Sequence, residues 1–177
     1  MWHGGGLDHA GRTRGFQLWI ALPPELELGP TVSIYQAPGN VPEDGPVRVL
    51  LGRYGSASSA IQSPSPINYL AVRLNAGERW RYQPPADHTV LWVAIGSGAL
   101  SAPEDLRCGD LAAFEPSDKA VEFEARTDAE FVLGSATPHA HDLVTGYYSV
   151  HTSRDALRDG EADIASIRER LVREGRL

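Results

Sequence analysis

The stretch VLWVAIGSG, residues 90–98, decides the fold class of this chain. Its first part is apolar at every position, so both faces of an extended segment are apolar, as in a central strand that is covered on both sides. A short buried helix has similar content, but Val90, Val93 and Ile95 are β-branched and a Gly-Ser-Gly follows. We therefore predict a buried strand that ends in a turn near residue 96.

Short apolar or alternating segments recur on both sides of this strand. Turn signals such as Ala-Pro-Gly-Asn at 37–40 and Glu-Asp-Gly-Pro at 43–46 separate them. The expected strands lie at 16–22, 32–36, 47–53, 67–74, 88–95, 110–114, 121–125, 130–133 and 143–151. This spacing, with 18 Gly and 13 Pro in 177 residues, predicts an all-β sandwich or small barrel.

After residue 152 the apolar period changes to that of a helix. Ser153 is a good N-cap, and residues 164, 167 and 171 form an apolar stripe at helical spacing. We expect Gly160 to divide this segment into a short helix and a longer one. The resulting amphipathic extension is expected to pack on the barrel or on a second subunit.

Composition and charge exclude several classes of protein. Sixteen Lys and Arg against 23 Asp and Glu give a formal net charge of −7, which argues against general binding to nucleic acid or to an anionic membrane. No segment has the roughly 18 apolar residues of a membrane span, and the N-terminus does not have the pattern of a signal peptide. The single cysteine, Cys108, suits a reducing compartment. We expect a soluble cytoplasmic protein.

The segment Trp-His-Gly-Gly-Gly at 2–6 resembles the oxyanion loop of lipases and esterases. Those hydrolases also need a Gly-x-Ser-x-Gly nucleophile elbow, and the chain contains no such pattern. The serine-rich segment 55–59 is not followed by the apolar helix that an elbow requires. Hydrolase chemistry is therefore not expected.

A longer pattern between Gly77 and Gly96 has the glycine spacing of the first motif of cupin barrels. In metal-binding cupins, this motif supplies two histidines and a glutamate to a divalent metal. The matching positions here are Gln83, Pro85 and Thr89. Because this set does not offer the imidazole and carboxylate ligands of a transition metal, we predict no metal at these positions.

The segment GDLAAFEP at 109–116 resembles the second cupin motif, and Val121 stands near its histidine position. Valine offers no ligand either. His88 lies one residue from the glutamate position of the first motif. We interpret it as a core or strand-end residue, because a metal site needs three or more converging ligands.

Two further segments resemble the pirin family of two-cupin proteins. FQLWIALP at 16–23 is similar to the GFQLWVNLP segment that begins the second half of pirins, and GYYSVHT at 146–152 stands in the place of their GPFVMNT segment. A helical tail follows in both. The resemblance covers nearly the whole chain and implies a single cupin-type (jelly-roll) barrel with a C-terminal helical segment, similar to the pirin C-terminal cupin.

The pirin metal lies in the N-terminal cupin, where the resemblance aligns only a remnant of the motif. His3 matches a metal-binding histidine, whereas Gly5 stands where the glutamate is expected. The resemblance therefore implies that the N-terminal metal-binding cupin is missing, and that iron and quercetin dioxygenase activity do not carry over. The expected domains are an N-terminal remnant at 1–15, a cupin barrel at 16–152 and a helical extension at 153–177.

A separate histidine cluster departs from the pirin pattern and is expected to be particular to this chain or its subgroup. His139 and His141 lie on one face if the segment is extended, Asp142 is adjacent, and His151 follows further on. Two histidines with a third histidine or an aspartate could bind zinc or iron. The alternative is a surface loop at 138–142 and a His151 that hydrogen-bonds the end of the barrel.

Two functions stay open at this point. The first is a cupin module without a metal cofactor that acts through a small-molecule ligand in the barrel or through a protein partner. The second is a metal-dependent dioxygenase of the quercetinase type, with iron or zinc held by His139, His141 and His151, or by His3 across a dimer. We favour the first, and we expect a homodimer because exposed apolar patches usually find a partner.

Overall fold

The computed structural model describes residues 15–177, so His3 and the segment 2–6 lie outside the described residues. Within this range the chain divides into two compact units. The sheet unit is Ile34–Pro138, and the helix unit joins the described part of Met1–Ser33 to His139–Leu177. These units show which segments pack together. They do not test the expected domains at 1–15, 16–152 and 153–177, which stay a prediction.

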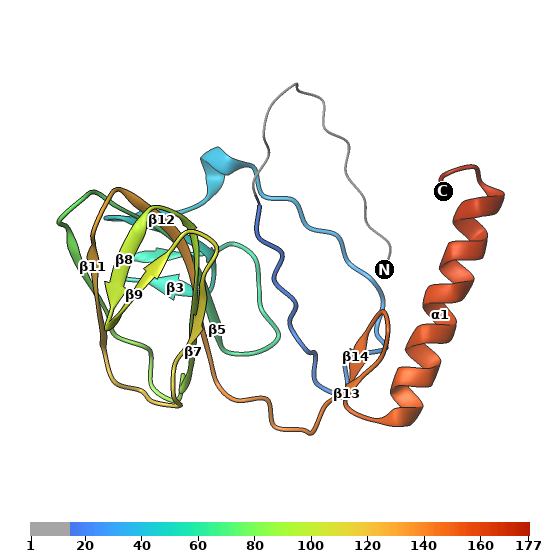
Figure 1. The fold of residues 1–177 in the computed structure, drawn as a ribbon. Helices are drawn as coiled ribbons and strands as arrows, with labels where there is room; N and C mark the ends of the chain where they lie inside the picture. Colours follow the sequence, from blue (N-terminus) through green and yellow to red (C-terminus); the bar gives the residue numbers. More distant parts are fainter. Residues whose placement is uncertain (1–14) are drawn as a thin grey trace. The chain divides into compact units, whose positions relative to one another are not determined.

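The sheet unit consists of antiparallel β-structure (Figure 1). Its larger sheet has the order β1 (Glu43–Asp44), β2 (Val47–Leu51), β5 (Ile67–Leu74), β12 (Ala129–Ala136), β7 (Val90–Ser97) and β10 (Leu111–Ala113). The smaller sheet has the order β6 (Arg79–Tyr82), β11 (Val121–Ala125), β8 (Ala99–Ala102) and β9 (Glu104–Arg107). A two-stranded ribbon, β3 (Arg53–Tyr54) with β4 (Ala57–Ser58), and a 3₁₀ turn, η1 (Pro38–Asn40), complete this unit.

The core of the sheet unit lies between the two sheets. Every second residue of β5 from Asn68 onward is buried, as the alternation of a half-buried strand requires. The rings of Phe123 on β11 and Phe131 on β12 lie 5.5 Å apart, so the inner faces of the two sheets are in direct contact. The prediction of an all-β chain with a helical C-terminus is confirmed, with the described strands forming a pair of facing sheets.

Local patterns predicted some strands to the residue and failed for others. β5 and β11 have the predicted bounds, whereas 16–22 and 32–36 are not strands. A strand needs a neighbouring strand as well as apolar residues, and sequence propensity reports only the latter. The same reasoning missed β6, β8 and β9, which are short and carry charged or small residues.

The strand that opened the sequence analysis is β7, and its two faces differ. Leu91, Val93 and Ile95 are buried in the core, as expected. On the other face Val90 is 39% exposed and Trp92 is half-buried, so the prediction of a strand covered on both sides was wrong. The Trp92 ring instead packs against Tyr69 of β5, with ring centroids 5.9 Å apart, and this surface contact accounts for its apolar character.

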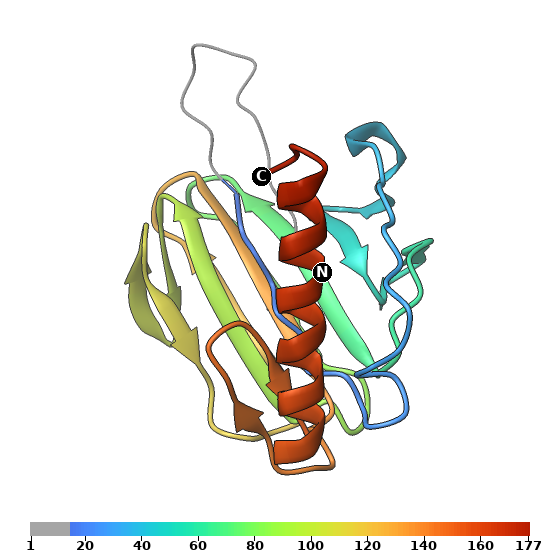
Figure 2. The same cartoon turned by 90° about the vertical axis from the view of Figure 1, so that its right-hand side faces the viewer.

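The helix unit contains a hairpin, β13 (Val144–Thr145) with β14 (Val150–His151), which leads into helix α1 (Arg154–Arg173) (Figure 2). The Ser153 hydroxyl accepts a hydrogen bond from the Ala156 N–H, so the predicted N-cap is confirmed. The predicted break at Gly160 was wrong, since α1 runs through it. No helix in residues 15–177 has the length and apolar character needed to cross a membrane.

Gly160 has a packing role instead. A Cβ at this position would lie 2.4 Å from Nε2 of His151, so the helix or the imidazole would have to shift to accommodate it. Glycine in a helix interior costs about 1 kcal/mol relative to alanine, but the helix keeps its hydrogen bonds. The glycine therefore permits a close approach of α1 to His151 without ending the helix.

Candidate functional site

A buried polar network lies between the two sheets of the sheet unit. Asn68 on β5 and Ser135 on β12 are directly opposite each other in the antiparallel register, so both side chains point to the same face. Tyr82 reaches them from β6 in the other sheet: Asn68 Nδ2 donates to Tyr82 Oη at 3.1 Å, and Tyr82 Oη lies 2.7 Å from Ser135 Oγ. These three side chains are 3%, 1% and 1% exposed, so the network is shielded from water.

His88 joins this network from the turn that precedes β7. Its N–H donates to Pro85 O at 3.2 Å, and the neighbouring Asp87 has a φ of 68°, in the left-handed region. This turn directs the His88 ring inward, where Nδ1 lies 2.9 Å from Ser135 Oγ. No hydrogen bond of its Nε2 is found within residues 15–177, and the residue lines the adjoining pocket.

Burial sets the protonation of both ring systems in the network. It lowers the pKa of His88, against the opposing effects of a hydrogen bond with the Ser135 backbone and of the charge on Asp87, so the imidazole is neutral at pH 7. It raises the pKa of Tyr82, although hydrogen bonds with Asn68 and Ser135 oppose the shift. The network is therefore composed of uncharged groups near neutral pH.

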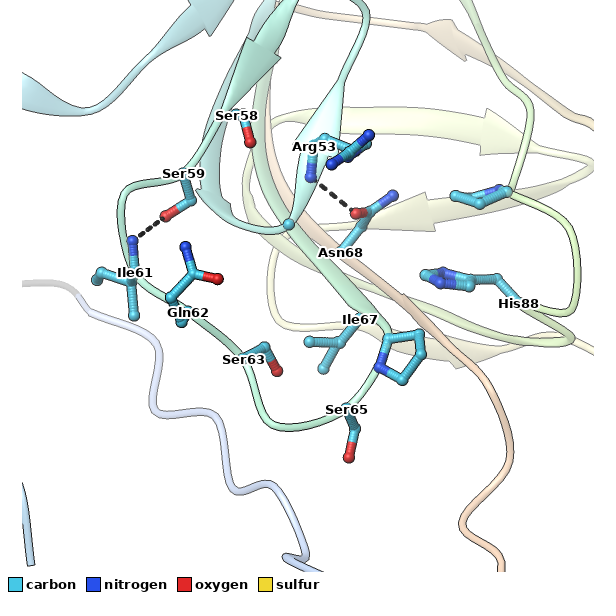
Figure 3. Close-up of a pocket in the computed structure, with 13 residues that line it drawn as sticks. Arg53, Ser58, Ser59, Ile61, Gln62, Ser63, Ser65, Ile67, Asn68 and His88 are labelled. Atoms are coloured by element: carbon cyan, nitrogen blue, oxygen red, sulfur yellow. Dashed lines mark hydrogen bonds between the residues drawn. The ribbon is translucent and has the colours of Figure 1, made fainter.

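A pocket of about 370 Å³ opens beside this network, and we call it the His88 pocket (Figure 3). Figure 3 shows the His88 ring reaching from its loop toward Asn68 and the serine-rich loop opposite. A Cβ at Gly52 would lie 2.2 Å from Asn68 Oδ1, so glycine allows the chain to pass close enough for the Arg53 N–H to donate to that oxygen at 2.9 Å. The lining residues are Gly52, Arg53, Ser58, Ser59, Ile61, Gln62, Ser63, Ser65, Pro66, Ile67, Asn68, Pro85 and His88.

The residues at the cupin ligand positions do not fit a transition metal. Gln83 is exposed, and its Nε2 donates to Asp118 O at 2.9 Å and to Pro84 O at 3.3 Å. Pro85 lines the His88 pocket but has no donor atom in its side chain, and Thr89 supplies only a hydroxyl. Iron and zinc prefer imidazole, carboxylate or thiolate ligands, and His88 is a single imidazole.

The histidines predicted to bind metal occur in two separate settings of the helix unit. His139 and His141 are near each other, with ring centroids 5.8 Å apart, in a segment without regular secondary structure. His139 Nδ1 accepts a hydrogen bond from the His141 N–H at 3.2 Å. His139 Nε2 lies 3.4 Å from Leu22 O.

His151 has a different partner, Glu27, and with Thr152 they form what we call the His151 cluster. The His151 Nδ1 lies 3.2 Å from Glu27 Oε2, and the two side chains are 6% and 5% exposed. Thr152 donates to the same carboxylate from its N–H at 2.8 Å and from its hydroxyl at 2.7 Å. Burial alone raises the pKa of Glu27, but these hydrogen bonds and the charge of His151 bring it below its usual value.

Within residues 15–177, no group of three or more His, Cys, Asp or Glu side chains is arranged to hold a metal ion. Because His3 lies outside this range, the metal site predicted from His139, His141, His151 and His3 stays a prediction. The sequence did not predict the His88 network, because Asn68, Tyr82 and Ser135 belong to separate strands. Only the polar Asn68 and Ser135 on otherwise apolar strand faces signalled it.

Comparison with known proteins finds relatives that carry two different names. The chain is 25% identical over 147 residues to a candidate quercetin 2,3-dioxygenase of Pseudomonas aeruginosa, covering 80% of this chain and 51% of that protein. It is 25% identical over 169 residues to a pirin-like protein of Caulobacter vibrioides, covering 93% of this chain and 58% of that protein. The chain spans about half the length of these relatives. No family model matches the sequence.

Solved structures resemble the chain at the level of fold. A quercetin 2,3-dioxygenase from Acinetobacter baumannii matches with a TM-score of 0.61 and 20% identity, covering 68% of this chain and 42% of that chain. A second structure of a protein with that name and source matches with a TM-score of 0.60 and 15% identity, covering 71% and 43%. The predicted cupin-type fold and the resemblance to pirins are thereby confirmed.

Proposed function

We propose that this chain, a single cupin domain related to pirin-like and quercetin dioxygenase-like proteins, is a metal-free binding module that takes a small molecule in the His88 pocket. One observation carries this proposal. Where the cupin motif supplies metal ligands, this chain has an amide, a proline and a hydroxyl, and an uncharged hydrogen-bonded network stands beside them. Such a site recognises a ligand by hydrogen bonds and does not supply redox chemistry.

The pocket has the composition of a small-molecule site. Apolar side chains of Ile61 and Ile67 form part of its wall, and polar groups of Asn68, His88 and several serines converge on it. Ligand pockets generally combine an apolar lining with a few polar groups that fix orientation. In this proposal, the ligand-bound form of the module is the form that binds a protein partner.

Self-association forms a second part of the proposal. In the helix unit, Trp19 is 63% exposed, Val32 is 69% exposed and Tyr147 is 85% exposed. Large exposed apolar side chains support an interface with a second copy of the chain. Light scattering at micromolar concentration should give twice the mass of the chain, and a stable monomer would contradict the homodimer. The exposed, unpaired Cys108 suits the cytoplasmic location that we propose.

The test of the metal-free module uses the purified chain, before and after incubation with Fe²⁺ or Zn²⁺. We expect no stoichiometric metal by elemental analysis and no oxygen consumption with quercetin in either sample. Amide resonances of Ser59, Asn68 and His88 should shift when small molecules are added in an NMR fragment screen. Metal-dependent oxygen consumption would overturn the proposal.

The second candidate function is a metal-dependent dioxygenase, and the names of the relatives favour it. It would need iron or zinc at a site built from His139, His141 and His151, or at an intersubunit site that includes His3. The same measurements distinguish it, because only this candidate requires bound metal and oxygen turnover.

A further inference from the structure

We propose, building on the function proposed above, that the His88 pocket takes the carboxylate of a small organic acid, which accepts a hydrogen bond from His88 Nε2 and faces the Arg53 guanidinium. Two independent observations support a carboxylate. The first is the direction of the hydrogen bonds that run from the Arg53 N–H to His88, and the second is the charge of the residues that line the pocket.

The direction of the hydrogen bonds starts at a backbone group that can only donate. The Arg53 N–H donates to Asn68 Oδ1 at 2.9 Å, which fixes the orientation of the Asn68 amide. Its Nδ2 therefore points the other way and donates to Tyr82 Oη at 3.1 Å. Tyr82 accepts this bond and must place its own proton elsewhere.

The Tyr82 proton has one acceptor among the described residues, Ser135 Oγ at 2.7 Å. Because Tyr82 and Ser135 are each 1% exposed, a missed hydrogen bond would not be replaced by water. Ser135 then accepts from Tyr82 and donates to His88 Nδ1 at 2.9 Å. A neutral imidazole that accepts at Nδ1 carries its proton on Nε2, so His88 presents a donor to the pocket.

The lining of the pocket is free of negative charge. It contains no Asp or Glu and one cation, Arg53, although the chain has a net charge of −7. Arg53 is exposed, and its guanidinium makes no ion pair within residues 15–177. A carboxylate would satisfy the Nε2 donor and the guanidinium together, whereas an amine or a neutral alcohol would leave the cation without a counter-ion.

The rest of the lining suits the organic part of such an acid. Ile61, Ile67, Pro66 and Pro85 supply apolar surface. The Ser63 hydroxyl is inaccessible to solvent and has no partner in the described part of the chain, so it is available to a ligand after a change of side-chain rotamer. A compact ring or short chain bearing one carboxylate therefore fits the pocket chemically better than a polyanion does.

The tautomer of His88 is measured first, by long-range ¹⁵N–¹H correlation spectra of the imidazole at neutral pH. The His88→Asn variant assigns the signals. We expect the proton on Nε2, and we expect Ser135→Ala to shift the ring toward a mixture of tautomers because the Nδ1 partner is gone. A proton on Nδ1 in the unaltered protein would overturn the proposal.

The ligand class is measured with three probes that share one ring: benzoate, benzyl alcohol and benzylamine. We expect benzoate to bind about tenfold or more tighter than the alcohol, since a hydrogen bond to a charged acceptor is stronger than one to a neutral acceptor. Arg53→Ala should weaken benzoate about tenfold. This variant keeps the backbone N–H that orders Asn68, and Arg73→Ala, which alters an exposed arginine outside the pocket lining, should leave benzoate binding unchanged.

Equal binding of the three probes, a preference for the amine, or no binding at all would overturn the carboxylate assignment. Tight binding of benzyl alcohol with the proton on Nε2 would also overturn it, but would leave the small-molecule module in place. Metal-dependent oxygen consumption would overturn the proposed function itself. The two failures are therefore distinguishable.

Discussion

Among residues 15–177, each of the two units buries one histidine, and the hydrogen-bond partners of the two rings differ in charge. His88 in the sheet unit and His151 in the helix unit are both 6% exposed. The His88 ring meets a neutral hydroxyl, Ser135, whereas the His151 ring meets a carboxylate, Glu27. Equal burial therefore leads to different chemistry: the first ring is a neutral group that can donate to a ligand, and the second belongs to a polar cluster that joins segments far apart in the chain.

Among the variants that test this difference, Ser135→Ala is expected to have the largest effect on stability. The change removes the partner of both Tyr82 and His88 inside a site that water does not reach. We expect the free energy of unfolding of the sheet unit to fall by about 3 kcal/mol. Urea denaturation followed by tryptophan fluorescence measures it, since Trp80 and Trp92 belong to this unit. Ser58→Ala, at an exposed serine of the same pocket, is the control and should change stability little.

Glu27→Ala tests the helix unit in the same way. It leaves the Thr152 N–H and hydroxyl and the His151 Nδ1 without their carboxylate. We expect a loss of about 2 kcal/mol, seen as earlier melting of the helical circular dichroism signal of α1. Thr152→Ser keeps the hydroxyl and should retain most of the stability. If Glu27→Ala loses less stability than Thr152→Ser, the His151 cluster does not stabilise the helix unit.

Gly160→Ala sharpens the comparison at the point where α1 passes His151. Helix propensity alone predicts a gain of about 1 kcal/mol. The new Cβ would lie 2.4 Å from His151 Nε2, so we expect overpacking to exceed this gain and to give a net loss of about 1 kcal/mol. Ala162→Gly, at an exposed position of the same helix, should lose about 1 kcal/mol from propensity alone. A stabilised Gly160→Ala variant would contradict the close contact.

Acid should affect the His88 site through its lowered pKa. Protons bind the unfolded chain near the ordinary histidine pKa of 6.5 before they bind the folded one, because burial holds the pKa of His88 below that value. The stability that depends on neutral His88 is therefore complete above this pH and is lost as the pH falls below it toward the folded pKa. Denaturation midpoints between pH 7 and pH 5 should fall more in the unaltered protein than in His88→Asn. If the denaturation midpoints of the unaltered protein and of His88→Asn fall equally between pH 7 and pH 5, the lowered pKa of His88 is contradicted.

The smallest effect is expected from the double variant His139→Ala with His141→Ala. Both residues lie in an irregular segment, and surface substitutions change stability by about 0.5 kcal/mol or less. Metal content by elemental analysis and oxygen consumption with quercetin should be unchanged. If the purified protein holds metal and this variant loses it, the histidine pair belongs to a metal centre and the dioxygenase becomes the better assignment.

Features that depend on neighbours in the sequence were predictable. Alternating apolar residues gave the bounds of β5 and β11, and a serine before an apolar stripe gave the start of α1. The segment FQLWIALP at 16–23 and the glycine spacing of the cupin motif carried the resemblance to pirins, which implied the cupin-type fold. Gly160 shows the limit of such reasoning, because the local rule treats glycine as a helix breaker and has no information on the side chain that lies opposite.

The sequence by itself determined the all-β class, the helical C-terminus and the chemistry that the cupin positions lack, because periodicity, capping and side-chain identity are local properties. Only the tertiary structure decided which polar groups meet. Ser135 lies 53 residues from Tyr82 and 47 residues from His88 along the chain, and Glu27 lies 124 residues from His151. Sheet register and the burial of facing surfaces bring these groups within hydrogen-bond distance, and no local pattern records which residues end up paired.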